Sequence, residues 1–164
     1  MRKFVIGVIQ MDSQSDVDEN LKTASAFIEE AAARGAKLVA MPENMHYVGL
    51  ESAAHAEEIP GGKTFLVMSA LAKKHKLWLH CGSIYEKNPN DARPYNPDGE
   101  LVAKYHKIHP FDVVIPDGPV NKESDRICPG DEIVTVDTKE VGNWGLSICY
   151  DIRFAELYRL MALE

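Results

Sequence analysis

Cys149 lies where a short apolar run meets the start of a predicted helix, in residues 146–157 (LSICYDIRFAEL). A cysteine thiolate is a nucleophile, and the pKa of a cysteine falls when its sulfur lies at a helix N-terminus. The backbone N–H of the residue that follows a nucleophile can stabilise an oxyanion. A packed core cysteine would show the same local pattern, because cysteine is among the most buried residue types. The stretch alone leaves both readings of Cys149 open.

Two charged residues also lie at the ends of apolar runs. Glu43 follows residues 37–41 (KLVAM), and Lys107 lies at the end of residues 101–108. In α/β proteins such strand ends carry the functional residues. Taken singly, Glu43 could be a solvated or capping acid and Lys107 a surface lysine. Together with Cys149, however, they supply a nucleophile, a proton acceptor and a cation for hydrolysis.

The apolar pattern predicts the elements that must position these side chains. A strand, a helix and a second strand follow one another at the start of the chain, which indicates a βαβ unit and an α/β fold. The first helix is predicted to start at Asp16 or Asp18 and to end at Gly35. The predicted strands are 4–10, 37–41, 77–84, 101–108, 133–136 and 144–148, and the other predicted helices are 63–76 and a segment from Asp151.

Two features suggest a partial chain. The turn 96–100 (NPDGE) is of a kind that joins antiparallel strands, but no apolar run precedes it. The sequence also stops inside an amphipathic helix. We therefore expect residues 1–164 to form a single domain that lacks its C-terminal part.

Charge and composition narrow the classes of partner. The formal net charge of −7 argues against nucleic-acid binding, which draws on basic patches. No apolar run approaches the length of about 20 residues that spans a membrane. The N-terminus reads as a strand and not as a signal peptide, so we expect a cytoplasmic protein. The three cysteines, Cys81, Cys128 and Cys149, are too widely spaced to indicate a disulfide framework or a zinc site.

Three segments resemble the signature segments of the nitrilase superfamily of carbon–nitrogen hydrolases. They are PEN around Glu43, YHKIHPFD around Lys107 and SICYDIRFAEL around Cys149. The resemblance implies an α-β-β-α sandwich of the nitrilase type, in subunits that pair into a homodimer or a larger homo-oligomer. It also implies that Glu43 is the general base, Lys107 the oxyanion-stabilising cation and Cys149 the nucleophile. Glu123 falls where the family has a further glutamate that positions the lysine and the substrate.

The implied reaction is the hydrolysis of a small-molecule amide through a thioester on Cys149, with no metal or organic cofactor. The segments KIHPFDV and CYDIRF are most similar to the omega-amidase branch, which acts on monoamides of short dicarboxylic acids. Tyr150 is a candidate to bind the substrate through its backbone N–H, and Arg153 through its guanidinium, which can hold a carboxylate by two hydrogen bonds. An ion pair of Arg153 with Glu156 or Asp151 would explain that arginine equally well.

Three other functions stay open at this point. An N-carbamoyl amino acid hydrolase would also present an acid group to an arginine. A catalytically inactive relative, or a fragment that acts as a binding or assembly module, would fit the signs of a partial chain. A cysteine redox sensor ranks last, because no resolving cysteine lies near Cys149 in the sequence.

Overall fold

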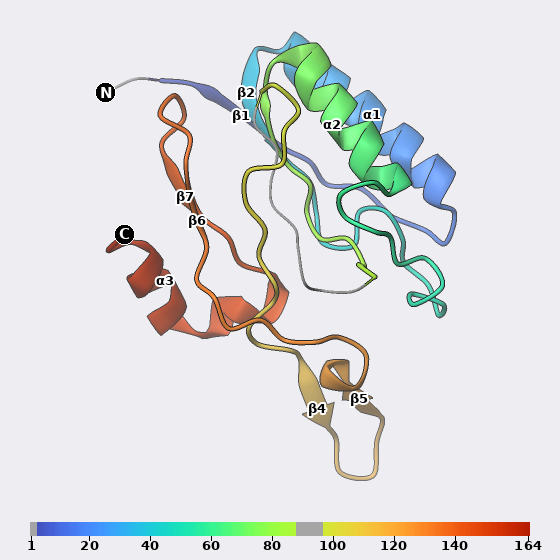
Figure 1. Ribbon diagram of the computed structural model, residues 1–164. Helices are drawn as coiled ribbons and strands as arrows, with labels where there is room; N and C mark the ends of the chain where they lie inside the picture. Colours follow the sequence, from blue (N-terminus) through green and yellow to red (C-terminus); the bar gives the residue numbers. More distant parts are fainter. Residues whose placement is uncertain (1–2, 88–96) are drawn as a thin grey trace.

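The computed structural model describes residues 3–87 and 97–164 (Figure 1). Its first half alternates strands and helices, and the three strands form one parallel sheet in the order β1-β2-β3. Both helices lie side by side on one face of this sheet (Figure 1). The predicted βαβ unit and α/β architecture are confirmed. The elements are β1 (Val5–Val8), α1 (Val17–Ala33), β2 (Ala36–Ala40), α2 (Lys63–His75) and β3 (Trp78–His80).

Helix α1 starts and ends where its local sequence predicts. The Asp16 side chain accepts hydrogen bonds from the backbone N–H groups of Asp18 and Glu19, which satisfies donors that the first helical turn leaves free. Gly35 follows the helix with a φ of 84°, the left-handed conformation that favours glycine at a helix end. One face of α1 is buried against the sheet through Leu21, Ala24, Ile28 and Ala31.

The second half contains two antiparallel hairpins and short helices. The β4–β5 hairpin projects from the rest of the molecule, and α3 packs beside β7 (Figure 1). The elements are β4 (Asp112–Val114), β5 (Val120–Lys122), η1 (Glu123–Asp125), β6 (Thr135–Asp137), β7 (Asn143–Gly145), η2 (Cys149–Arg153) and α3 (Ala155–Met161).

A second apolar cluster joins the β6–β7 hairpin to the sheet. The rings of Trp78 on β3 and Trp144 on β7 meet edge to face, with their centroids 5.8 Å apart. Tyr105, Val136 and Leu146 are buried in this cluster. The layers therefore run from α1 and α2 through the parallel sheet and the hairpin to α3, which is the order of an α-β-β-α sandwich.

Some predicted elements differ in the structure. Residues 102–108 do not form a strand, because their apolar side chains pack into the second cluster without strand pairing. The helix predicted from Asp151 is instead the 3-10 helix η2 followed by α3, with a break at Phe154, whose φ and ψ are −110° and 88°. Most other strands are shorter than predicted by one or more residues. Residues 88–96 before the turn, where the sequence offers no apolar run for the second strand of a hairpin, lie outside the described residues.

Candidate active site

Three of the charged residues singled out above meet at one place. The Lys107 Nζ lies 2.7 Å from Glu123 Oε2 and 3.8 Å from Glu43 Oε1. Glu43 lies in the turn after β2, and Glu123 begins η1 after the β4–β5 hairpin. Lys107 is buried. Segments far apart in the sequence thus place one ammonium between two carboxylates.

Cys149 lies beside this group, at the first residue of η2. Partial burial of its sulfur and the charge and hydrogen bonding of Glu43 raise the pKa of the thiol, while the positive charge of Lys107 opposes them. The net shift is therefore upward, opposite to the lowering that a position at a helix N-terminus predicts. The thiol keeps its proton at neutral pH, next to a carboxylate that can accept it.

Lys107 holds its charge in spite of its burial. Burial lowers the pKa of Lys107, but the hydrogen bond and charge of Glu123, the negative charge that Cys149 gains on deprotonation, and the charge of Glu43 raise it above its usual value overall. The same Glu123 oxygen also accepts a hydrogen bond of 2.6 Å from the Phe111 backbone N–H. Glu123 thereby ties the lysine to the base of the β4–β5 hairpin.

The two candidate substrate-binding residues lie on η2. The Tyr150 ring packs edge to face with Phe111 and Phe154, with centroids 5.0 and 5.6 Å apart. Arg153 is exposed, and across residues 3–87 and 97–164 it makes no ion pair with either Asp151 or Glu156. The structural alternative for Arg153 is therefore not found in this part of the chain, and substrate binding stays a prediction.

Two residues near the site were not predicted to take part in it. Asp151 is completely buried and accepts hydrogen bonds from both sides of Lys107, whereas the sequence indicated only the start of a helix and an alternative ion-pair partner for Arg153. The pKa of Tyr85 is raised by burial and by the charges of Glu43 and Glu123, while the positive charges of Arg126 and Lys107 lower it, so the charges of the site act on Tyr85. The sequence signal for Asp151 was its place in CYD, two residues after the cysteine, but nothing local indicated its burial.

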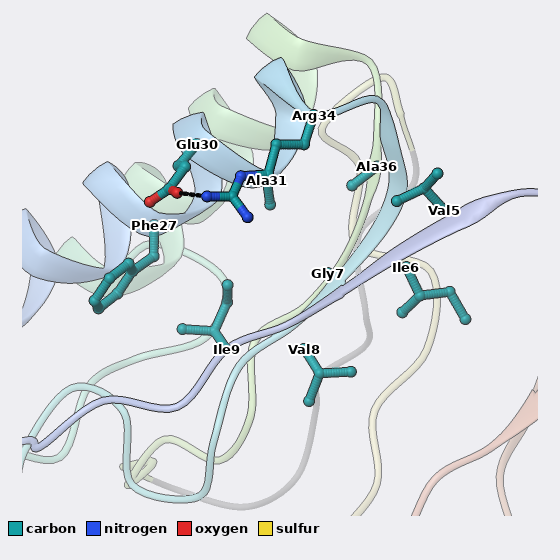
Figure 2. A pocket seen from close by; sticks show the side chains of 10 residues that line it. All are labelled: Val5, Ile6, Gly7, Val8, Ile9, Phe27, Glu30, Ala31, Arg34 and Ala36. Carbon is teal, nitrogen blue, oxygen red and sulfur yellow. Dashed lines mark hydrogen bonds and ion pairs between the residues drawn. The ribbon is translucent and has the colours of Figure 1, made fainter.

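A cavity of about 370 Å³ elsewhere in the molecule contains none of these residues (Figure 2). It lies between β1 and α1 and is lined mostly by apolar side chains, with the ion pair of Glu30 and Arg34 at its edge (Figure 2). Its lining residues include no cysteine, serine, threonine or lysine that could act as a nucleophile. Within the described residues, no cluster of His, Cys, Asp and Glu could hold a metal ion. The same residues include no helix that is long and apolar enough to cross a membrane.

Comparison with known proteins identifies the family. The model of the carbon-nitrogen hydrolase family matches residues 5–164. The chain is 40% identical to the omega-amidase NIT2 of Homo sapiens and to the hydrolase C26A3.11 of Schizosaccharomyces pombe. These alignments cover 99% and 98% of the chain but 60% and 52% of the relatives. The chain thus spans little more than half the length of these relatives.

Solved structures show the same fold. The C. elegans NitFhit protein matches 93% of this chain with a TM-score of 0.78 and 35% identity, over 39% of its own length. Saccharomyces cerevisiae Nit3, described as a member of branch 10 of the nitrilase superfamily, matches 96% of this chain with a TM-score of 0.77 and 31% identity, over 59% of its length. The prediction of a nitrilase-type α/β fold is confirmed. The chain belongs to the carbon-nitrogen hydrolase family, within the nitrilase superfamily.

Proposed function

We propose that the chain hydrolyses the amide bond of a small carboxylic acid and releases ammonia, with Cys149 as the nucleophile. The observation that carries this proposal is the Lys107 ammonium at 3.8 Å from the Glu43 carboxylate, beside a thiol whose pKa both charges perturb. A base, a cation and a nucleophile within mutual reach are the parts that acyl transfer requires. Membership of the carbon-nitrogen hydrolase family supports the same chemistry.

The first half of the reaction forms a thioester. Glu43 takes the thiol proton while the Cys149 sulfur attacks the amide carbonyl carbon, and the carbonyl electron pair moves to oxygen. The Lys107 ammonium, with the Tyr150 backbone N–H, stabilises this oxyanion. When the intermediate collapses, the C–N bond breaks and the proton on Glu43 passes to the leaving nitrogen. Ammonia departs and the acyl group stays on sulfur.

The second half releases the acid. Glu43, again a carboxylate, takes a proton from water while the water oxygen attacks the thioester carbonyl. Collapse of the second tetrahedral intermediate breaks the C–S bond, and the sulfur regains a proton from Glu43. The Glu123 carboxylate keeps the Lys107 ammonium in place through both halves by its bond of 2.7 Å.

Arg153 and the relatives that are named omega-amidases support one substrate class. We infer that the substrate carries a carboxylate at the end opposite its amide. An exposed guanidinium four residues from the nucleophile, with no ion pair among the described residues, can bind that group by two parallel hydrogen bonds.

The test is ammonia release by the full-length protein from three groups of compounds. They are monoamides of dicarboxylic acids of four and five carbons, N-carbamoyl amino acids, and nitriles with the same carbon chains. We expect turnover of the monoamides in wild type and none in Cys149→Ala, with unchanged circular dichroism. Turnover by Cys149→Ala would refute the mechanism, and a preference for N-carbamoyl amino acids would refute the substrate class.

A further inference from the structure

The Asp151 side chain is completely buried two residues after Cys149, and its two oxygens accept four hydrogen bonds. Oδ2 accepts from the Tyr105 hydroxyl at 2.7 Å and from the Ile148 N–H at 2.9 Å. Oδ1 accepts from the His109 N–H at 3.0 Å and contacts its Nδ1 at 2.7 Å. Because an ionised carboxylate only accepts, the proton of this last bond is on Nδ1.

Two of these donors hold the segment that carries Lys107. Tyr105 precedes the lysine by two residues and His109 follows it by two, so one carboxylate is bonded on both sides of Lys107. The Tyr105 hydroxyl also accepts a hydrogen bond of 3.1 Å from the Ile108 N–H. Residues 102–108 have no strand pairing to fix their position. The bonds to Asp151 supply part of the order that a sheet would otherwise provide.

The same carboxylate holds the turn that carries Cys149. The Ile148 N–H donates to the Asp151 side chain, and the Asp151 N–H donates back to the Ile148 carbonyl at 3.1 Å. These two bonds enclose Cys149, whose φ of 48° is left-handed and unusual for a residue with a side chain. The bonds to Asp151 keep Cys149 in this conformation.

Asp151 is ionised at neutral pH. Burial by itself raises the pKa of this carboxyl, but the hydrogen bonds from Tyr105, Ile148 and His109 outweigh burial and bring the pKa below its usual value. Its bonds are therefore charge-assisted, which makes them shorter and stronger than bonds between neutral groups.

From these contacts we propose that Asp151 is a positioning residue that sets the place of the Cys149 sulfur relative to the Lys107 ammonium. This inference rests on the hydrolytic function proposed above. Asp151 acts through the two segments it joins, and its own oxygens are occupied by Tyr105, Ile148 and His109.

Asp151→Asn is the sharpest variant because it keeps the shape of the side chain and exchanges one acceptor oxygen for an NH₂ donor. In either orientation the new donor faces a backbone N–H, that of His109 or that of Ile148. We expect kcat to fall about 100-fold, because a small displacement of a reacting group costs that much, while KM stays within about 3-fold. Tyr105→Phe removes one donor only, and we expect a fall in kcat of about 10-fold.

A second measurement reports on the sulfur itself. The rate of alkylation of Cys149 by iodoacetamide, followed by peptide mass spectrometry across pH, gives the thiol pKa. We expect its midpoint in Asp151→Asn to move down, toward that of an ordinary thiol, because the sulfur leaves its place beside the negative charge of Glu43. Asp16→Asn is the matched control, since the N-cap of α1 also accepts two backbone N–H bonds and lies outside the site.

The outcomes separate this inference from the proposed function. A folded Asp151→Asn protein with wild-type kcat and an unmoved alkylation midpoint would overturn the positioning role. If Asp151→Asn does not fold, Tyr105→Phe decides by the same two measurements. If the wild-type protein turns over no amide, the proposed function fails, and the alkylation midpoints still decide whether Asp151 positions Cys149.

Discussion

At the residue scale, two opposite charges act on one thiol. Glu43 raises the pKa of Cys149 and Lys107 lowers it, and burial adds to the effect of Glu43. In the resting site the sulfur of Cys149 is therefore protonated. Attack on a substrate requires transfer of this proton to Glu43. This differs from cysteine sites that hold a preformed thiolate. Removal of the Glu43 charge and removal of the Lys107 charge are therefore expected to shift the pKa of Cys149 in opposite directions.

Glu43→Gln removes the base and a charge that opposes the thiolate. We expect kcat to fall by about 10²- to 10⁴-fold, the usual contribution of a general base. We also expect the alkylation midpoint of Cys149 to fall, because the negative charge no longer disfavours the thiolate. Exposed Glu58→Gln serves as the control. An unchanged kcat in Glu43→Gln would contradict the assigned role.

Lys107→Gln removes the cation. We expect kcat to fall by about 10²- to 10³-fold through the loss of oxyanion stabilisation. The alkylation midpoint of Cys149 is expected to rise, since the positive charge of Lys107 holds this pKa down. Steady-state kinetics and alkylation across pH measure the two effects. A midpoint that falls in both variants would show that charge does not govern the thiol.

At the element scale, the turn after β2 that carries Glu43 rests on the end of β3. Gly82 has a φ of 65°, and a Cβ on it would lie 1.8 Å from the Pro42 carbonyl oxygen. The Ser83 hydroxyl oxygen accepts a hydrogen bond of 2.8 Å from the Asn44 backbone N–H. The backbone after β3 therefore sets the position of the turn, and with it the position of the base.

Two glycine substitutions distinguish the cost of a side chain at positive φ from the cost of a steric clash with neighbouring backbone. Gly35→Ala and Gly82→Ala both place a side chain at positive φ, at a cost of about 1–2 kcal/mol each. Only Gly82→Ala also collides with neighbouring backbone, whereas a Cβ on Gly35 meets nothing within 4 Å. We expect Gly82→Ala to lose more unfolding free energy than Gly35→Ala. We expect kcat to fall only in Gly82→Ala. Urea denaturation measures the unfolding free energy and steady-state kinetics measures kcat. Equal losses of unfolding free energy in the two variants would contradict the steric contact between position 82 and Pro42.

At the scale of the whole molecule, packing between layers assembles the site. Glu43 comes from the turn after β2, and Lys107 and Cys149 come from segments that meet in the second apolar cluster through Tyr105, Leu146 and Ile148. The edge of the sheet that β1 forms is apolar and exposed. β1 is an edge strand in the sheet of the described residues, and its Val8 is 81% exposed. An apolar edge strand is a template for pairing with another chain.

Val8→Lys is expected to lower the self-association of the polypeptide of residues 1–164 without loss of unfolding free energy, because a charged side chain on an edge strand opposes pairing. Leu50→Lys is the matched control, since Leu50 is fully exposed in a loop away from any strand edge. Light scattering against concentration measures the effect. Equal behaviour of the two variants would show that the β1 edge does not drive association.

Local sequence determined the features that depend on a few neighbouring residues. The start of α1 at Asp16 and its end at Gly35 were predictable, because capping bonds and backbone preference act within one turn. The alternation of strands and helices in the first half was predictable from apolar periodicity. The segments around Glu43, Lys107 and Cys149 indicated the family, which the comparisons confirm.

Only the tertiary structure decided how those segments meet. The bond of Lys107 to Glu123 and the three bonds of Asp151 to Tyr105 and His109 join segments whose approach no local pattern encodes. The periodicity of 101–108 predicted a strand, but from residue 102 on its apolar side chains pack into a cluster without strand pairing. The thiol pKa was misjudged for the same reason. Burial and charge at Cys149 depend on distances across the fold, and distances of that kind are set by packing and not by neighbours along the chain.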